Sequence, residues 1–296
     1  MLHLKDFLKH IDTSHLHEKI SKFRDLDFKR MSYQEVQSAI NKVITFNTPQ
    51  GNICVLTPMS ASYPAGTRFY RVRSLPEDDK ILPLRTMSKV VDCWEPPEHV
   101  VQAGRLNREN ESLLYTAPIL PFVAVEEMKI NDNQLFSLIV YEALEQINVT
   151  MIGQVPNVDG LNSDEALKAR MLQDFLRHEF IRDVGVGTEY LYRISESIAK
   201  DYFDLPPDFQ DAWCYPSVAK KGHVNVCFRK GKRDKLKFIG TQITSIIRQN
   251  ENYSFHPRLI ATTAVDGSNL SYYKIGSEIQ RNLFPEIMVQ RYNENI

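Results

Sequence analysis

The sequence lacks several features that would mark particular classes of protein. It has no apolar run of about 18 residues, so it predicts no transmembrane helix. Its first residues are too charged to form the apolar core of a signal peptide. Its 36 basic and 37 acidic residues give a net charge of −1, so no overall field attracts nucleic acid or an anionic membrane. These absences predict a cytoplasmic protein that binds neither a membrane nor nucleic acid directly.

Cysteine and histidine are too dispersed to predict a metal site. Cys54, Cys93, Cys214 and Cys227 form no CxxC pair, and the eight histidines show no metal-ligand spacing. Because no export signal accompanies them, the cysteines are expected to be reduced thiols. The sequence therefore predicts no bound metal and no resident cofactor.

The N-terminal part is expected to be helical. Apolar residues recur at helical spacing before residue 30, and Ser32 with Glu35 fits a capping box that opens a helix to about Ile44. The simpler interpretation is a solvated helical pair that covers a core. The alternative is a docking arm for a partner protein or for a second copy of the chain.

The rest of the chain mixes strands and helices, which predicts an α+β fold with mixed central sheets and flanking helices. Residues 45–58 predict a hairpin, residues 67–73 a strand, and residues 134–153 one or two strands. Asn162 or Ser163 is expected to cap a helix over 163–182. Residues 74–99 form a long loop of the kind that often covers a functional site.

Five blocks of sequence stand out because they combine charged, aromatic and hydroxyl side chains. The strand Phe69–Arg73 places Arg71 and Arg73 on one face, and a Gly-Arg-Leu-Asn turn contains Arg105. The other three are the strand LLYTA with Tyr115, a helix that opens AVEE with Glu126 and Glu127, and the segment CYPSVAKKGHVNVCF.

In this order, the five blocks resemble the RES domain family, over roughly residues 65–230. The resemblance implies an ADP-ribosyltransferase-like fold and an enzyme that destroys NAD+ by hydrolysis or phosphorolysis of its nicotinamide–ribose bond. Several members of the family are toxins whose partner is a helix-turn-helix antitoxin. The expected division is a helical extension with the hairpin at 1–60, the RES domain at 61–232, and a C-terminal extension packed on it at 233–296. A homodimer is a further expectation.

Matched residue by residue, the resemblance implies a site of Arg71, Arg105, Tyr115, Ser217 and Asn225 with one glutamate. Counting from Tyr115 favours Glu126 as that glutamate, whereas the Ala-x-x-Glu pattern favours Glu127, and this choice stays open. Without the resemblance, each residue has an ordinary interpretation: surface arginines, a core tyrosine, helix-start carboxylates and a turn serine.

The chemistry of NAD+ explains why these residue types would be useful together. Arginines bind phosphate oxygens through paired, charge-assisted hydrogen bonds, and a tyrosine ring stacks on the cationic nicotinamide. A carboxylate stabilises the oxocarbenium-like cation that forms on the ribose. Ser217 would hold the carboxamide or the ribose. Two alternatives remain open: transfer of ADP-ribose to a macromolecule, and nucleotide binding without catalysis.

Overall fold

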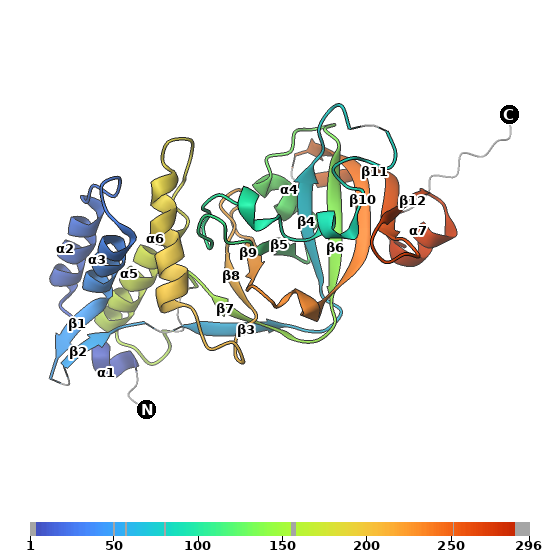
Figure 1. The fold of residues 1–296 in the computed structure, drawn as a ribbon. Coiled ribbons are helices and arrows are strands. Elements are labelled where there is room, and N and C mark those ends of the chain that lie inside the picture. The colour runs from blue at the N-terminus through green and yellow to red at the C-terminus, as the bar shows by residue number, and fades with distance from the viewer. Residues whose placement is uncertain are drawn as a thin grey trace. The chain divides into compact units, whose positions relative to one another are not determined.

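A computed structural model describes residues 4–49, 51–56, 58–79, 81–154, 158–250 and 252–287. The chain forms two compact units that alternate along the sequence. The first unit comprises Met1–Ser62, Pro97–Ser112 and Asn148–Val218, and the second comprises Tyr63–Pro96, Leu113–Ile147 and Ala219–Ile296. Helices and strands occur in both, so the fold is α+β as the sequence predicts (Figure 1).

The first unit is rich in helices. It contains α1 (Leu4–Leu8), α2 (Thr13–Arg24), α3 (Tyr33–Ile44), β1 (Thr45–Thr48), β2 (Gly51–Cys54), most of β3 (Met59–Tyr63), η2 (Glu98–Val100), most of β7 (Ile147–Met151), α5 (Ser163–Phe180), η3 (Glu189–Leu191), α6 (Tyr192–Ser197), the π-helical turn η4 (Ile198–Tyr202) and β8 (Ala212–Pro216). β1 and β2 form the predicted hairpin, and β7 pairs with β8 in parallel.

Local capping explains where the helices of the first unit begin. Ser32 accepts a hydrogen bond from the Glu35 amide while the Glu35 carboxylate accepts from the Ser32 amide, which confirms the predicted capping box of α3. Asn162, rather than Ser163, caps α5 in the same reciprocal way with Glu165. α2 and α5 pack through Phe23 and Phe175, whose ring centroids are 5.0 Å apart. These side chains belong to the buried core of the unit.

The second unit is built on an antiparallel sheet with the strand order β12-β11-β10-β6-β4-β5-β9. Its elements are β4 (Arg68–Ser74), η1 (Val90–Cys93), β5 (Leu114–Pro118), α4 (Pro121–Glu127), β6 (Phe136–Ala143), β9 (Val224–Phe228), η5 (Arg233–Lys235), β10 (Leu236–Gln249), β11 (Asn252–Thr263), β12 (Leu270–Lys274) and α7 (Glu278–Leu283). In the last part of the chain the sequence pattern predicts a single strand, near Phe238, whereas the structure forms three strands there, β10, β11 and β12.

α4 packs on one face of this sheet, against β4 and β5 (Figure 1). Val123, Ala124 and Val125 of the helix are buried in one apolar cluster with Val72 of β4 and Ala117 of β5. Burying such side chains contributes about 1.5–3 kcal/mol each for the larger ones. This contact fixes the end of α4 that carries the two adjacent glutamates.

No helix in the described ranges is both long enough and apolar enough to cross a membrane.

Gly240 in β10 offers a test of the sheet packing. The register of β10 against β6 shifts between Phe238 and Gly240, and a Cβ atom at Gly240 would lie 2.7 Å from the Ala261 carbonyl oxygen. We expect Gly240→Ala to lower the free energy of unfolding by about 1–3 kcal/mol, because the backbone of β11 would have to move. Thermal denaturation followed by circular dichroism measures the change. Gly185→Ala, where no atom lies within 4 Å of the added carbon, is the control. Equal effects of the two substitutions would contradict the packing described here.

Candidate functional site

The two adjacent glutamates lie at the C-terminal end of α4, not at the helix start that the sequence predicted, because α4 begins at Pro121 and ends at Glu127. They have different partners. Glu126 accepts a hydrogen bond at 2.8 Å from Nε of Arg248, whose Nη1 also donates to Asp132 at 2.6 Å. Arg248 further donates to the Ile130 carbonyl. Glu126 is therefore part of an ion-pair network that ties the end of α4 to β10.

Glu127 instead contacts the segment that leads into β9. Its Oε1 accepts a hydrogen bond of 2.7 Å from Nδ2 of Asn225 and a long one of 3.5 Å from the Ala219 amide. Asn225 is 5% exposed, so its side chain is fixed by its surroundings and holds the carboxylate in one position. The structure thus joins two candidate residues that lie 98 positions apart in the sequence.

Tyr115 lies on the same face of the sheet as Asn225. In the register of β5 and β9, Tyr115 is directly opposite Cys227, and Asn225 is two residues before Cys227 on the same strand. Ala117, two residues after Tyr115, packs in the apolar cluster with α4, which identifies this side as the α4 face. The Tyr115 side chain is half-buried. Tyr115, Asn225 and Glu127 therefore share one face of the second unit.

Arg71 lies on the other face of this sheet. Tyr70 and Val72 of β4 pack against the α4 cluster, so the alternating positions Phe69, Arg71 and Arg73 point to the opposite side. The ring contact of Phe69 with Phe228, at 5.2 Å between centroids, belongs to that opposite side. The predicted grouping of Arg71 and Arg73 with Phe69 on one face agrees with this geometry, but the sheet separates Arg71 from Glu127.

The Arg71 face is covered by part of the long loop that the sequence predicted as a cover. Trp94 packs on Tyr141 with ring centroids 4.9 Å apart, the Tyr141 hydroxyl donates to the Cys93 carbonyl, and Arg73 donates to the Asp92 carbonyl at 3.0 Å. Within the described residues, Nη1 of Arg71 is buried without a hydrogen-bond partner, and so is Oε2 of Glu95. Arg71, Arg73 and Glu95 are themselves half-buried, so this face contains a partly accessible polar cluster.

Burial controls the ionisation of two groups in the same cluster. It raises the pKa of the Cys93 thiol to about 12, an effect that the nearby Arg71 guanidinium partly offsets. It also raises the pKa of the Tyr141 hydroxyl, again with a partial offset from Arg71. Cys93 is therefore protonated at neutral pH and is a poor nucleophile.

Arg105 and Ser217 belong to the first unit. Nη1 of Arg105 donates to the Phe180 carbonyl at 2.6 Å and to the Arg182 carbonyl at 3.1 Å, and its guanidinium lies 5.8 Å from the centre of the Tyr192 ring. Arg105 thus holds the C-terminal end of α5. Ser217 is buried directly after β8.

Sequence reasoning missed the aromatic residues close to Glu127. Phe122 of α4 stacks on Tyr253 of β11 with centroids 4.5 Å apart, and His223 meets the Phe122 ring edge-on at 5.2 Å. The Lys220 ammonium lies 5.2 Å from the centre of the Tyr253 ring. These contacts hold the segment that contains Ala219 and leads to Asn225. In the sequence, this region is marked only by the turn Lys220-Lys221-Gly222. Nothing in the sequence indicates that this turn lies against α4 or β11.

In the ranges that the structure describes, no group of three or more histidine, cysteine, aspartate or glutamate side chains is arranged to hold a metal ion.

Thiol labelling tests the environment assigned to the cysteines. All four are free thiols; Cys54 is exposed, and the other three are buried. We expect a maleimide to modify Cys54 in the native protein and to leave Cys93 unmodified, because Cys54 is exposed and Cys93 is buried. Peptide mass mapping after a short exposure measures this. Modification of Cys93 as fast as Cys54 would show that the loop does not cover the Arg71 face.

A substitution of Arg105 separates its structural contacts from a role in binding a phosphate. We expect Arg105→Met to lower the free energy of unfolding by about 1–3 kcal/mol, because two carbonyls lose their donor. Arg30→Met is the control, since the Arg30 side chain is 88% exposed and contacts only Asp27 among the described residues. A variant with unchanged stability but a raised KM for a nucleotide would instead assign Arg105 to ligand binding.

Comparisons of this chain with protein-family models, with curated proteins and with solved structures find no match in any of the three.

Proposed function

We propose that this protein cleaves NAD+ at the bond between nicotinamide and ribose, and that Glu127 is the carboxylate that stabilises the cation formed in this reaction. The observation that supports this most strongly is the 2.7 Å hydrogen bond between Glu127 and Asn225. It joins Asn225, which the resemblance to the RES domain family places in the site, to one of the two glutamates between which that resemblance leaves the choice open. A surface glutamate needs no such buried partner, whereas a carboxylate that must face a substrate at a fixed angle does.

The reaction would proceed by departure of nicotinamide. The C1′–N1 bond of the ribose breaks, its electron pair leaves with the nicotinamide nitrogen, and positive charge develops at C1′. A fixed carboxylate beside C1′ stabilises that charge, and it orients the water or phosphate that then bonds to C1′. Asn225 would act as a positioning residue, because its amide donates to Glu127 and not to the reacting atoms.

Two further features support this proposal. Tyr115 lies on the same face of the sheet as Glu127 and Asn225, and in the proposed reaction its ring would stack on the nicotinamide. The five sequence blocks occur in the order typical of the family, which supports an ADP-ribosyltransferase-like fold for the core. We infer on the same grounds that the protein acts in the cytoplasm as a toxin or defence effector, with a helix-turn-helix antitoxin as its partner and a homodimer as a further assembly.

Two other functions fit the same scaffold. Transfer of ADP-ribose to a macromolecule would use the same cation and the same carboxylate, with a protein or nucleic acid group as acceptor. Binding of a nucleotide without turnover would need Tyr115 and Asn225 but not the charge of Glu127. Labelled NAD+ separates these, because transfer leaves label on a macromolecule and simple binding leaves NAD+ intact.

The adjacent glutamates provide a matched pair of variants for the central test. We expect the purified protein to release nicotinamide from NAD+, and Glu127→Gln to lower kcat by about 10²–10³-fold because the developing cation loses its counter-charge. Glu126→Gln should change kcat by less than about threefold. It should cost no more than about 1 kcal/mol of stability, since Glu126 and Arg248 are each partly exposed. Chromatography of nicotinamide and of the ADP-ribose product, with and without phosphate, measures both the rate and the acceptor.

The opposite pattern would contradict the assignment. If Glu126→Gln abolished activity while Glu127→Gln kept it, the catalytic carboxylate would be Glu126, which is ion-paired with Arg248. If the wild-type protein left NAD+ intact with water, phosphate and macromolecular acceptors alike, the enzymatic proposal itself would fail.

A further inference from the structure

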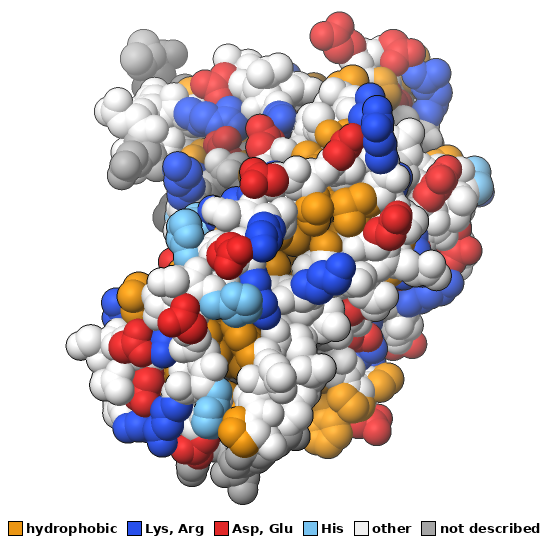
Figure 2. All heavy atoms as spheres, turned by 90° about the vertical axis from the view of Figure 1, so that its left-hand side faces the viewer, with side chains coloured by type: hydrophobic (Ala, Val, Ile, Leu, Met, Phe, Trp, Pro, Cys, Tyr) orange, Lys and Arg blue, Asp and Glu red, His pale blue; other side chains and the backbone are white. Residues whose placement is uncertain are grey.

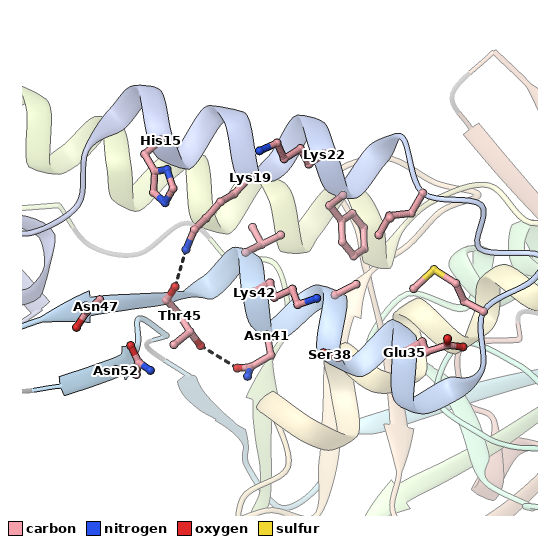
Figure 3. Close-up of a pocket in the computed structure, with 15 residues that line it drawn as sticks. His15, Lys19, Lys22, Glu35, Ser38, Asn41, Lys42, Thr45, Asn47 and Asn52 are labelled. Carbon is pink, nitrogen blue, oxygen red and sulfur yellow. Dashed lines mark hydrogen bonds between the residues drawn. The ribbon is translucent and has the colours of Figure 1, made fainter.

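The first unit contains a cleft that uses none of the candidate catalytic residues. It lies between α2, α3 and the β1–β2 hairpin and has a volume of about 810 Å³ (Figure 3). We call it the basic cleft, because His15, Lys19, Lys22 and Lys42 line it. Figure 2, viewed from the side on which α2 and α3 are drawn in Figure 1, shows basic, histidine and acidic side chains interspersed around exposed apolar atoms.

The basic side chains of the cleft are spread along its length. His15, Lys19 and Lys22 recur on one side of α2 at intervals of four and three residues, so they span about 10 Å at 1.5 Å per residue. Lys42 comes from α3 and makes no ion pair or hydrogen bond within the described part of the chain. A single phosphate is bound best where several donors converge on one point, which this arrangement does not provide.

The carboxylates near the basic cleft are already engaged. Glu18 pairs with Lys22 at 2.7 Å and lies 3.9 Å from Nδ1 of His15, while Glu35, which itself lines the cleft, accepts hydrogen bonds from the Ser32 amide and hydroxyl at 2.7 and 2.8 Å. Lys19 is held against the wall, with its Nζ donating to the Thr45 carbonyl at 2.6 Å and lying 4.1 Å from the centre of the Phe46 ring. These two contacts therefore fix the position of the Lys19 ammonium group at the side of the cleft.

The lining between the cations is partly apolar. Phe23, Ala39 and Val43 form its buried part, and the more exposed Leu26 and Met31 complete it. An apolar groove receives the apolar face of an amphipathic peptide, and lysines along its edge favour acidic side chains on that peptide. Nucleic acid is a poorer fit, because the lining has no arginine and the chain as a whole carries a net charge of −1.

We propose that the basic cleft binds an acidic peptide segment of a partner protein, with carboxylates along one side that meet the lysines and apolar side chains that rest on the floor. Charge complementarity would steer the encounter, and the apolar contact would hold the bound segment. This proposal concerns a different site from the proposed cleavage of NAD+, and its test does not depend on that activity.

Selection from a random twelve-residue peptide display library against the full chain tests the proposal. We expect the enriched peptides to be rich in aspartate and glutamate with interspersed leucine or phenylalanine. A fluorescein-labelled consensus peptide is then titrated by anisotropy at two salt concentrations. The double variant Lys22→Glu, Lys42→Glu should bind it at least about tenfold more weakly, and added salt should weaken binding to the wild-type chain.

Lys29→Glu is the matched control, because Lys29 is exposed in the connection between α2 and α3 and does not line the cleft. It should bind the peptide within about twofold of the wild-type chain. Circular dichroism checks that every variant is folded, and Lys42→Glu alone serves if the double variant is not. Failure to enrich any peptide, enrichment of peptides without excess acid, or unchanged binding by the charge-reversed variants would overturn the proposal. So would tighter binding of a twelve-nucleotide single strand through the same lysines, since the partner would then be nucleic acid.

Discussion

The alternation of side chains along β4, β5 and β9 decides which residues of the second unit can share a ligand. Successive residues of a strand point to opposite faces of the sheet, so Tyr70 and Arg71 cannot serve the same pocket on one face. α4 packs on the face to which Val72 and Ala117 point. The helix and its two glutamates, Glu126 and Glu127, therefore lie on this face. Tyr115 and Asn225 lie on it as well. The opposite face carries Arg71 and Tyr141, and Trp94 packs on Tyr141.

This division changes the account of the candidate site. The resemblance groups two arginines, a tyrosine, a glutamate, a serine and an asparagine around one substrate. In the second unit, Tyr115, Glu127 and Asn225 share a face and Arg71 does not, while Arg105 is occupied with the carbonyls at the end of α5 in the first unit. The carboxylate and its amide partner are thus the part of the predicted site with the strongest geometric support, and the anion-binding part has less.

The sequence predicts features that depend on neighbouring residues and misses those that depend on distant ones. The predicted capping box at Ser32 and the predicted cap of α5 at Asn162 or Ser163 involve residues close together in the sequence, and the β1–β2 hairpin closes over a short turn. The choice between Glu126 and Glu127 depends on Arg248 and Asn225, which lie about a hundred residues away and join through the sheet register. β11 was not predicted either. Tyr253 and Phe255 alternate with polar residues, as expected for a strand, but a basic and proline-containing segment obscures this alternation.

A crystal structure of the Glu127→Gln variant with NAD+ tests the central claim most directly, since the variant should bind the substrate and turn it over slowly. Our account predicts that the nicotinamide ribose lies on the α4 face, with C1′ beside the residue at position 127 and the Asn225 amide behind it. Density for the ribose against Arg71 and Tyr141, on the face covered by Trp94, would contradict it.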